Sequence, residues 1–470
     1  MKERPKPFVF PEFCKGCGRC ISACSHHCIE MGQTIDPRTG LVPIQLHLEH
    51  CTGCGLCIDA CPEPYGLAAR PQQLGLDEPV PPQWLFGPRS TTAPRASPIP
   101  DEELPLPTDE PPLLVTKGTY AAALGALLAG CRHFFGYPIT PSTEGAELMA
   151  KLLPQLGGFF LQAVSEVAAV NMIYGCGGAG RRVMTFTSSP GFSLMLEGLS
   201  YMVGAEVPGV FVNVMRGGPG LGNIAPEQAD IKLACRGLGH GNTHAIVLAP
   251  ATPQEMLDFT REAFELAFRY RNPVVVLADG TLGQMTGRVT LPLTMTKPGL
   301  PDWAVFGDRE HRGNLISSIQ LSETDLEAHN VHLNAKYAEM TRREQRADLF
   351  ETDDAEVLFV ACNTPARAVK GAVAELRGRG IKAGLFRPQT LWPFPIDALR
   401  APLQHARRVI VVEASAGQLE DELRLAVSHA GLHCPPLAHV QHYGGVLPQP
   451  REIVEAALAS REAAFAGALP

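Results

Sequence analysis

The chain reads CKGCGRCISAC from Cys14 to Cys24, which places four cysteines at the spacing C-x-x-C-x-x-C-x-x-x-C. The same spacing returns from Cys51 to Cys61, in the stretch CTGCGLCIDAC. In both runs a glycine stands on either side of the second cysteine, and glycine tolerates positive φ and a close backbone approach. The repeat therefore predicts two equivalent sites, in each of which the chain folds tightly around a group held by thiolates.

Paired runs of this spacing are typical of a bacterial-ferredoxin-like α+β domain with two [4Fe–4S] clusters, in which the fourth cysteine of each run ligates the other cluster. A zinc site would need one pair of C-x-x-C or C/H elements per metal. Disulfides form in an oxidising compartment, and the N-terminal residues lack the apolar stretch of a secretory signal. The spacing therefore favours iron–sulfur clusters. The predicted ligands are Cys14, Cys17, Cys20 and Cys61 for cluster 1, and Cys51, Cys54, Cys57 and Cys24 for cluster 2.

Length and composition limit the remaining possibilities. At 470 residues the chain is long enough for about three domains. A formal net charge of −8 argues against nucleic acid as a partner, and no apolar run is long enough to span a membrane. Reduced thiols and low-potential clusters predict a cytoplasmic protein that transfers single electrons. The additional Cys28, His26 and His27 are interpreted as structural or solvent-exposed residues rather than as ligands.

Changes in composition divide the chain. Proline is concentrated after the cysteine runs, and it removes backbone donors, so we expect an extended linker there, with Trp84, Leu85 and Phe86 contacting the body of the protein. The rest of the chain has an α/β pattern. The predicted divisions are a ferredoxin-like domain (1–70), the linker (71–112), a first α/β domain (113–288), an irregular connector with a short helix around 334–346 (289–354), and a second α/β domain (355–470).

Apolar β-branched runs predict the strands of the two α/β domains. Their hydrophobicity is continuous rather than alternating, which indicates strands buried on both faces of a parallel sheet covered by helices. The expected strands are 183–187, 207–215, 245–249 and 274–278 in the first domain, and 357–361, 382–386 and 409–413 in the second. The expected helices are 120–129, 166–175, 254–270 and 366–377.

Several ordered motifs follow the linker, and together they resemble those of the α subunits of 2-oxoacid:ferredoxin oxidoreductases, closest to the 2-oxoisovalerate (branched-chain) branch. The motifs are YPITPS (137–142), SEVAA (165–169), TSSPGFSLM (187–195), RGGPGLG (216–222), GHG (239–241), DGTLGQM (279–285) and RPQTLWPFP (387–395). The resemblance implies a pyrimidine-type thiamine-diphosphate-binding domain followed by a transketolase C-terminal-like domain. It also implies the oxidative decarboxylation of a 2-oxoacid to acyl-CoA, with CoA as co-substrate.

The resemblance also implies roles for individual residues. Glu166 matches the glutamate that bonds the pyrimidine ring of the cofactor, although a surface glutamate on a helix is the alternative. Tyr137, Pro138 and Ile139 lie in the loop that binds cofactor, and the Thr140 hydroxyl would bond the substrate. Arg216 ends a buried strand, where open α/β sheets bind ligands, and its guanidinium suits a carboxylate. A structural ion pair is the alternative for Arg216.

The magnesium and diphosphate half of a thiamine site is missing from the chain. Asp279-Gly280 lacks the leading glycine and the later asparagine of that motif. We therefore expect thiamine diphosphate and Mg²⁺ to be shared with a diphosphate-binding β subunit that carries a further Fe–S cluster, alongside a γ subunit. The acceptor would be a ferredoxin or an NAD(P)-reducing flavoprotein. The alternatives are the same catalysis on 2-oxoglutarate or an aryl-glyoxylate, and a non-catalytic electron-transfer and scaffold subunit.

Two further positions have less specific expectations. His240, between two glycines, either lines the pocket or caps a turn. Glu227 and Asp230 are expected to pair with nearby basic residues rather than to take part in the chemistry.

Overall fold

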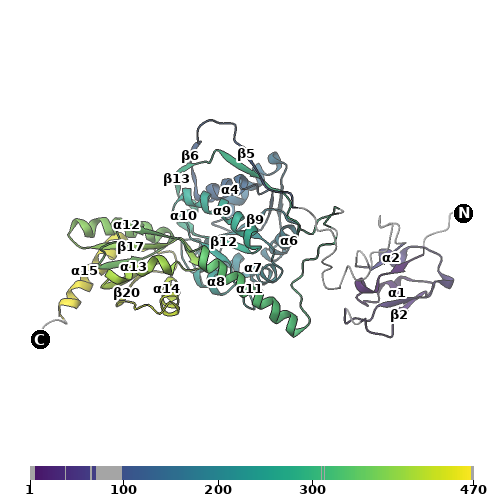
Figure 1. Cartoon of the computed structure of the whole chain (residues 1–470). Helices are drawn as coiled ribbons and strands as arrows, with labels where there is room; N and C mark the ends of the chain where they lie inside the picture. Colours follow the sequence, from purple (N-terminus) through teal and green to yellow (C-terminus); the bar gives the residue numbers. More distant parts are fainter. Residues whose placement is uncertain are drawn as a thin grey trace. The chain divides into compact units, whose positions relative to one another are not determined.

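The computed structural model of the chain describes residues 6–36, 39–63, 66–69, 98–308, 310–311 and 313–466. The chain divides into two compact units, Met1–Arg95 and Ala96–Pro470, which are drawn together in Figure 1. The linker predicted for 71–112 lies outside the described residues as far as residue 97, and so does the predicted contact of Trp84, Leu85 and Phe86. No helix in the described ranges is long and apolar enough to cross a membrane.

The first unit is built from two similar halves. Each half has a 3-10 turn, a run of three cysteines and a short helix, and two antiparallel strand pairs, β1 with β4 and β2 with β3, join the halves. Buried cysteines pack beside Ile29, Ile44 and Leu67 in its core. The elements are β1 (Phe8–Val9), η1 (Pro11–Phe13), α1 (Arg19–Ala23), β2 (Ile29–Met31), β3 (Ile44–Leu46), η2 (Leu48–His50), α2 (Leu56–Asp59) and β4 (Leu67–Ala68).

The second unit contains a seven-stranded sheet in the order β18-β11-β12-β10-β9-β7-β8, parallel except for β18. Its strands are β7 (His133–Gly136), β8 (Phe159–Gln162), β9 (Val183–Thr187), β10 (Gly209–Met215), β11 (Ile246–Leu248), β12 (Pro273–Asp279) and β18 (Thr390–Trp392). The helices around it are α4 (Gly118–Leu128), α5 (Thr143–Leu152), α6 (Glu166–Gly178), α7 (Ser189–Gly204), α8 (Ile231–Arg236), α9 (Pro253–Tyr270) and α10 (Gly280–Gln284), with the 3-10 turn η4 (Pro154–Leu156) after α5.

Both faces of this sheet are covered by helices. Along β10, Val210, Val212 and Val214 pack in the core that contains α4 and α9. Phe211 and Met215 pack in the core that contains α6 and α7. Alternate side chains of one strand therefore enter two cores, and this explains why the sequence is continuously apolar there.

A second, five-stranded sheet follows, in the order β15-β17-β16-β19-β20. Its strands are β15 (Ala347–Phe350), β16 (Val357–Val360), β17 (Ala383–Pro388), β19 (Arg408–Glu413) and β20 (Leu437–Gln441), with the helices α12 (Asn363–Gly378), α13 (Ile396–His405), α14 (Gln418–His429) and α15 (Pro450–Ala466). Immediately after β17, the chain enters β18, which pairs antiparallel with β11 of the larger sheet. The two α/β sheets thus share a continuous core (Figure 1).

Two segments differ from the elements that the sequence predicts. The helix expected around 334–346 is α11 (Glu323–Arg343), which begins earlier because the Ser322 hydroxyl accepts a hydrogen bond from the Asp325 N–H. Its buried residues are Leu333, Tyr337 and Met340, so its first turns carry no apolar periodicity. The other difference is two antiparallel ribbons, in which β5 (Glu102–Pro105) pairs with β14 (Thr294–Lys297) and β6 (Leu113–Lys117) pairs with β13 (Thr286–Thr290).

Candidate functional site

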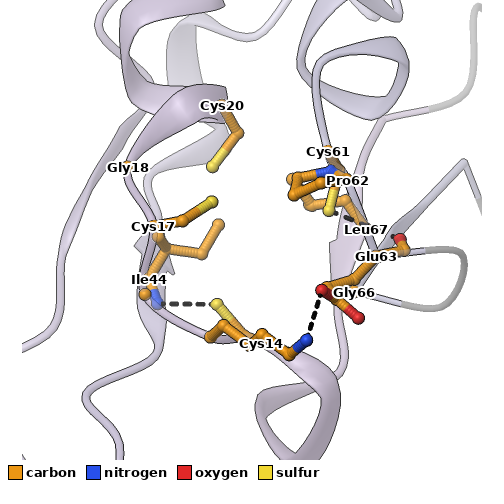
Figure 2. Close-up of a pocket in the computed structure, with 12 residues that line it drawn as sticks. Cys14, Cys17, Gly18, Cys20, Ile44, Cys61, Pro62, Glu63, Gly66 and Leu67 are labelled. Atoms are coloured by element: carbon orange, nitrogen blue, oxygen red, sulfur yellow. Dashed lines mark hydrogen bonds and ion pairs between the residues drawn. The ribbon is translucent and has the colours of Figure 1, made fainter. Parts of the chain in front are cut away.

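The first unit holds two cavities lined by cysteines. Figure 2 shows Cys14, Cys17, Cys20 and Cys61 with their sulfur atoms directed into one of them. The other cavity is lined by Cys24, Cys51, Cys54 and Cys57, together with Cys28. Each cavity therefore takes three cysteines from one run and the fourth cysteine from the other run. Among the described residues no three His, Cys, Asp or Glu side chains are close enough to bind one metal ion together. The thiols are therefore spaced for a group larger than a single ion.

Backbone geometry holds the cysteines around each cavity. Gly18 and Gly55 lie in the left-handed region, with φ of 76° and 84°, and each precedes the short helix that carries the third cysteine of its run. Backbone amides point at the sulfur atoms, since the Ile44 N–H donates to Cys14 Sγ at 3.3 Å. In the second cavity the Cys28 N–H donates to Cys24 Sγ, also at 3.3 Å. Such donors stabilise negative charge on thiolate sulfur.

Burial and the proximity of other cysteines oppose ionisation of two of these thiols, Cys20 and Cys57. Burial raises the pKa of the Cys57 thiol to about 11, and the nearby Cys24 and Cys54 contribute to the rise. Burial also raises the pKa of Cys20, with Cys14 contributing. A cationic iron core would reverse this effect, because metal ligation deprotonates thiols. The donor set and the cavities therefore fit two iron–sulfur clusters.

The predicted residues of the second unit lie at the carboxyl edge of the seven-stranded sheet. The chain leaves β7 toward β8 on one side and leaves β9 toward β10 on the other, so the two neighbouring strands β7 and β9 form a switch point. Open parallel sheets bind ligands outside such a point. The Tyr137–Thr140 loop follows β7, the start of α7 follows β9, and Arg216 follows β10. The fold therefore gathers these three motifs at one edge of the sheet.

Arg216 is buried and its guanidinium is held by backbone carbonyls. Nη1 donates to the Thr140 carbonyl at 2.8 Å, and Nη2 donates to the Leu221 carbonyl at 3.1 Å. The Nε–H has no partner, and no carboxylate lies within ion-pair distance of this side chain among the described residues. Only 7 % of Arg216 is exposed. A buried cation without a counter-charge suits an anionic ligand, and the alternative of a structural ion pair is not what the structure has.

Glu166 is the first residue of α6, and it follows the N-cap Ser165, whose hydroxyl accepts from the Ala168 N–H. Only 5 % of the residue is exposed, so it is not the surface glutamate of the alternative interpretation. Its side chain packs against Gly191 of α7, where an added Cβ would lie 2.6 Å from Glu166 Oε1. No protein hydrogen bond or ion pair reaches the Glu166 carboxyl group within the described ranges. A buried carboxyl group without a partner fits a ligand that donates to it or accepts its proton.

The loop after β7 is open to solvent at this edge. Tyr137, Pro138 and Thr140 are exposed, and Ile139 is half-buried. The Thr140 carbonyl bonds Arg216, so the backbone of this loop and the cation are joined, while the Thr140 side chain remains accessible. Thr140 and Arg216 are therefore direct neighbours, although the chain between them runs from α5 to β10.

Two acidic residues behave differently from the sequence-based expectation. Glu227 Oε2 accepts from the Gly218 N–H at 2.8 Å, and Asp230 Oδ2 accepts from Asn213 Nδ2 at 2.9 Å. Neither carboxylate has an ion pair in the described part of the chain, so the expected pairing with basic residues is wrong. Both residues are buried, and their hydrogen bonds come from backbone and amide N–H groups rather than from lysine or arginine.

His240 and Asp279 serve the scaffold. The Ser200 hydroxyl donates to the His240 carbonyl at 2.8 Å and lies 3.4 Å from His240 Nδ1, so the exposed His240 is joined to the second half of α7. The Asp279 carboxylate accepts from the Leu282 N–H, the Thr364 N–H and the Thr364 hydroxyl, each within 2.9 Å. Its oxygen atoms are thus bonded within the protein.

The sequence analysis did not predict a set of exposed apolar side chains on the segments near this edge of the sheet. We call it the apolar rim and define it as Val164, Leu194, Leu221, Ile224, Tyr443 and Val446, each more than half exposed. The loop of Tyr443 and Val446 belongs to the second α/β domain, and it is joined to the first because Asn223 Nδ2 donates to the Gly444 carbonyl at 2.9 Å. Leu194 lies on α7 and the other five residues lie in loops, so no periodic pattern marks this group of side chains in the sequence.

Three models of known protein families match successive parts of the chain. Residues 13–64 match the family model "4Fe-4S dicluster domain". Residues 124–346 match "Pyruvate flavodoxin/ferredoxin oxidoreductase, thiamine diP-bdg", and residues 355–453 match "Pyruvate:ferredoxin oxidoreductase core domain II". The fold and site thus define a thiamine-diphosphate-type oxidoreductase subunit with an iron–sulfur domain ahead of it.

The chain belongs to the family of 2-oxoacid:ferredoxin oxidoreductase subunits. It is 46% identical over 343 residues to ketoisovalerate oxidoreductase subunit VorB of Methanothermobacter thermautotrophicus, covering 73% of this chain and 96% of the relative. It is 39% identical over 344 residues to 2-oxoglutarate synthase subunit KorA of Archaeoglobus fulgidus, covering 72% and 96%. The solved 2-oxoglutarate:ferredoxin oxidoreductase of Magnetococcus marinus matches with a TM-score of 0.67 and 27% identity, covering 74% of this chain and 65% of that one.

Proposed function

We propose that this subunit supplies the pyrimidine half of a thiamine-diphosphate site and acts on a branched-chain 2-oxoacid of the 2-oxoisovalerate type. The family carries out CoA-dependent oxidative decarboxylation of 2-oxoacids, with electrons passed to iron–sulfur clusters. The observation that carries the proposal is made on two buried groups at one edge of the sheet: among the described residues, the Glu166 carboxyl group has no protein hydrogen bond, and the Arg216 guanidinium has no carboxylate partner and a free Nε–H. The greater identity to a ketoisovalerate enzyme subunit than to the 2-oxoglutarate synthase subunits supports the substrate class.

The roles of the protein residues follow from their surroundings. Bound thiamine diphosphate supplies the nucleophilic carbon and the electron sink for decarboxylation. The buried Glu166 carboxyl group is available to hydrogen-bond a pyrimidine nitrogen. Arg216 binds the substrate carboxylate through Nε–H and the outer face of its fork, while its two carbonyl contacts fix the orientation of the guanidinium. The Thr140 hydroxyl binds the 2-oxo or carboxylate oxygen.

The two cysteine cavities receive the electrons. We assign cluster 1 to Cys14, Cys17, Cys20 and Cys61, and cluster 2 to Cys24, Cys51, Cys54 and Cys57. The support is that each set lines one cavity. Clusters of this type carry one electron each, which suits a reaction whose two electrons leave singly.

The chain needs a partner subunit. Relatives are named as subunits, which implies a hetero-oligomer. The partner proposed here is a diphosphate-binding subunit that holds Mg²⁺ and docks on the apolar rim. The support is that six apolar side chains on the segments near the site are each more than half exposed, and a docked subunit would bury them. A γ subunit and a ferredoxin or flavoprotein acceptor complete the proposed assembly, in the cytoplasm.

An anaerobic dye-reduction assay tests the proposal. The complex is supplied with thiamine diphosphate, Mg²⁺, CoA and a viologen dye, and a panel of branched-chain 2-oxoacids, 2-oxoglutarate and aryl-glyoxylates is compared. We expect the greatest kcat/KM with branched-chain substrates, and a loss of about 10²- to 10³-fold in Glu166→Gln, which keeps the shape of the side chain but replaces the carboxyl group with an amide that cannot transfer a proton. Undiminished turnover in Glu166→Gln, or no turnover with any 2-oxoacid by a complex that contains clusters and cofactor, would leave an electron-transfer and scaffold subunit.

A further inference from the structure

We infer that Cys28 is a reserve ligand of cluster 2, able to replace Cys24 when that cysteine is lost, and that cluster 1 has no such reserve. The inference rests on the cluster assignment proposed above. It starts from an asymmetry in the first unit: one cavity is lined by four cysteines and the other by five.

The path of the backbone brings Cys28 to the cavity. His27 adopts the left-handed conformation with φ of 49°, which is uncommon for a residue with a side chain. The His27 N–H donates to the Cys24 carbonyl at 3.2 Å, so the chain turns back immediately after Cys24. This turn returns Cys28 to the same cavity, with its N–H 3.3 Å from Cys24 Sγ.

The Cys28 thiol interacts with the Cys24 thiol and with one backbone carbonyl. Its thiol donates weakly to the His26 carbonyl at 3.4 Å, and only 2 % of the residue is exposed. A buried thiol beside a cluster needs a change of side-chain rotamer to present its sulfur, rather than a rearrangement of the chain. The backbone donor to Cys24 Sγ also comes from Cys28, so the two residues already act at one end of the cavity.

Cavity 1 provides the internal control. When the two cysteine runs are superimposed in the sequence, Cys61 corresponds to Cys24 and Tyr65 corresponds to Cys28. The described residues around cavity 1 include no fifth cysteine. A phenol is a poor substitute for thiolate at a [4Fe–4S] cluster, so the two halves should respond differently to loss of the fourth ligand.

The test compares iron and sulfide content, and the electron paramagnetic resonance of the dithionite-reduced state, in anaerobically purified full-length complexes. The variants are Cys24→Ala, Cys61→Ala, Cys28→Ala and the double variant Cys24→Ala/Cys28→Ala. Relative to the wild type, we expect full iron in Cys24→Ala and Cys28→Ala. We expect a loss of up to about four irons per chain, one cluster, in Cys61→Ala and in the double variant.

The outcomes separate the inference from the ligand assignment. If Cys24→Ala loses as much iron as the double variant, Cys28 is not a reserve ligand. If Cys28→Ala alone loses a cluster, Cys28 is a primary ligand, and both the reserve role and the assignment fail. If Cys61→Ala keeps full iron, the assignment of cluster 1 fails. Circular dichroism of each variant, with Cys61→Ala as the matched loss of a fourth ligand, shows whether any iron loss comes from unfolding of the chain.

Discussion

Replacement of Arg216 by lysine is the most informative single change, because it keeps the charge and removes the planar fork. Arg216 uses Nη1 and Nη2 to hold the carbonyls of Thr140 and Leu221, and leaves Nε–H free. A lysine ammonium is a point charge on a flexible stem, and it cannot bond both carbonyls and a carboxylate in one fixed orientation. Arg216→Lys should therefore weaken substrate binding although the net charge is unchanged.

The size of the effect follows from the contacts that are lost. A hydrogen bond that involves a charged group contributes about 1.5–3 kcal/mol, and about 1.4 kcal/mol corresponds to a tenfold change. Loss of one such bond to the substrate lowers kcat/KM by about 10- to 100-fold. Because the carboxylate contact is present before the reaction starts, most of the loss should be a rise in KM rather than a fall in kcat.

Initial rates of dye reduction over a range of branched-chain 2-oxoacid concentrations measure both constants. The matched control is Arg182→Lys, since Arg182 is also buried and its guanidinium bonds Asp101 at 2.5 Å and Glu265 at 2.8 Å. Arg182 precedes β9 at the opposite edge of the sheet. Arg182→Lys should lower the melting temperature and leave KM unchanged. Arg216→Lys should raise KM and leave the melting temperature unchanged.

Two results would refute this reasoning. A kcat/KM of Arg216→Lys within about twofold of the wild type would mean that the guanidinium does not bind substrate. A fall in melting temperature as large as that of Arg182→Lys, without a change in KM, would mean that Arg216 is a structural residue that merely fastens two loops.

Two further predictions concern single side chains. Thr140→Val removes the hydroxyl but keeps the backbone carbonyl that bonds Arg216, so we expect kcat/KM to fall by up to about tenfold. Thr140→Ser should restore it. Equal kcat/KM in the wild type, Thr140→Val and Thr140→Ser would exclude the hydroxyl from substrate binding. Burial raises the pKa of Glu422 from 4.5 to about 7, despite the contact with Arg236 at 2.7 Å. The folded state therefore holds the proton more tightly than the unfolded state, and stability is lost as pH rises from 4.5 through 7, by up to about 3 kcal/mol. Denaturant unfolding at several pH values should show that loss in the wild type but not in Glu422→Gln, and parallel pH curves for the two proteins would contradict it.

Local spacing allowed part of the site to be predicted from the sequence. The expected strand at 183–187 and the expected helix at 254–270 lie within one residue of β9 and α9, because buried strands and amphipathic helices are recorded in nearest-neighbour patterns. The cross-run grouping of the cysteines also follows from spacing, as a short chain between cysteines leaves few ways to surround a cluster. The strands β7 and β8 were not predicted, since each has only four residues, too few to show a hydrophobic pattern.

What the sequence determined by itself is the chemistry: which residues are cysteine, which glutamate and arginine stand in motifs, and which runs are apolar. The tertiary structure decided which of them meet. The bond between Arg216 and the Thr140 carbonyl, the burial of Glu166 against Gly191 and the apolar rim join residues far apart in the chain. Such contacts depend on strand order and on where crossovers change direction, and these are set by packing of whole layers rather than by any local pattern. The same packing gave Glu227 and Asp230 backbone and amide partners in place of the expected ion pairs.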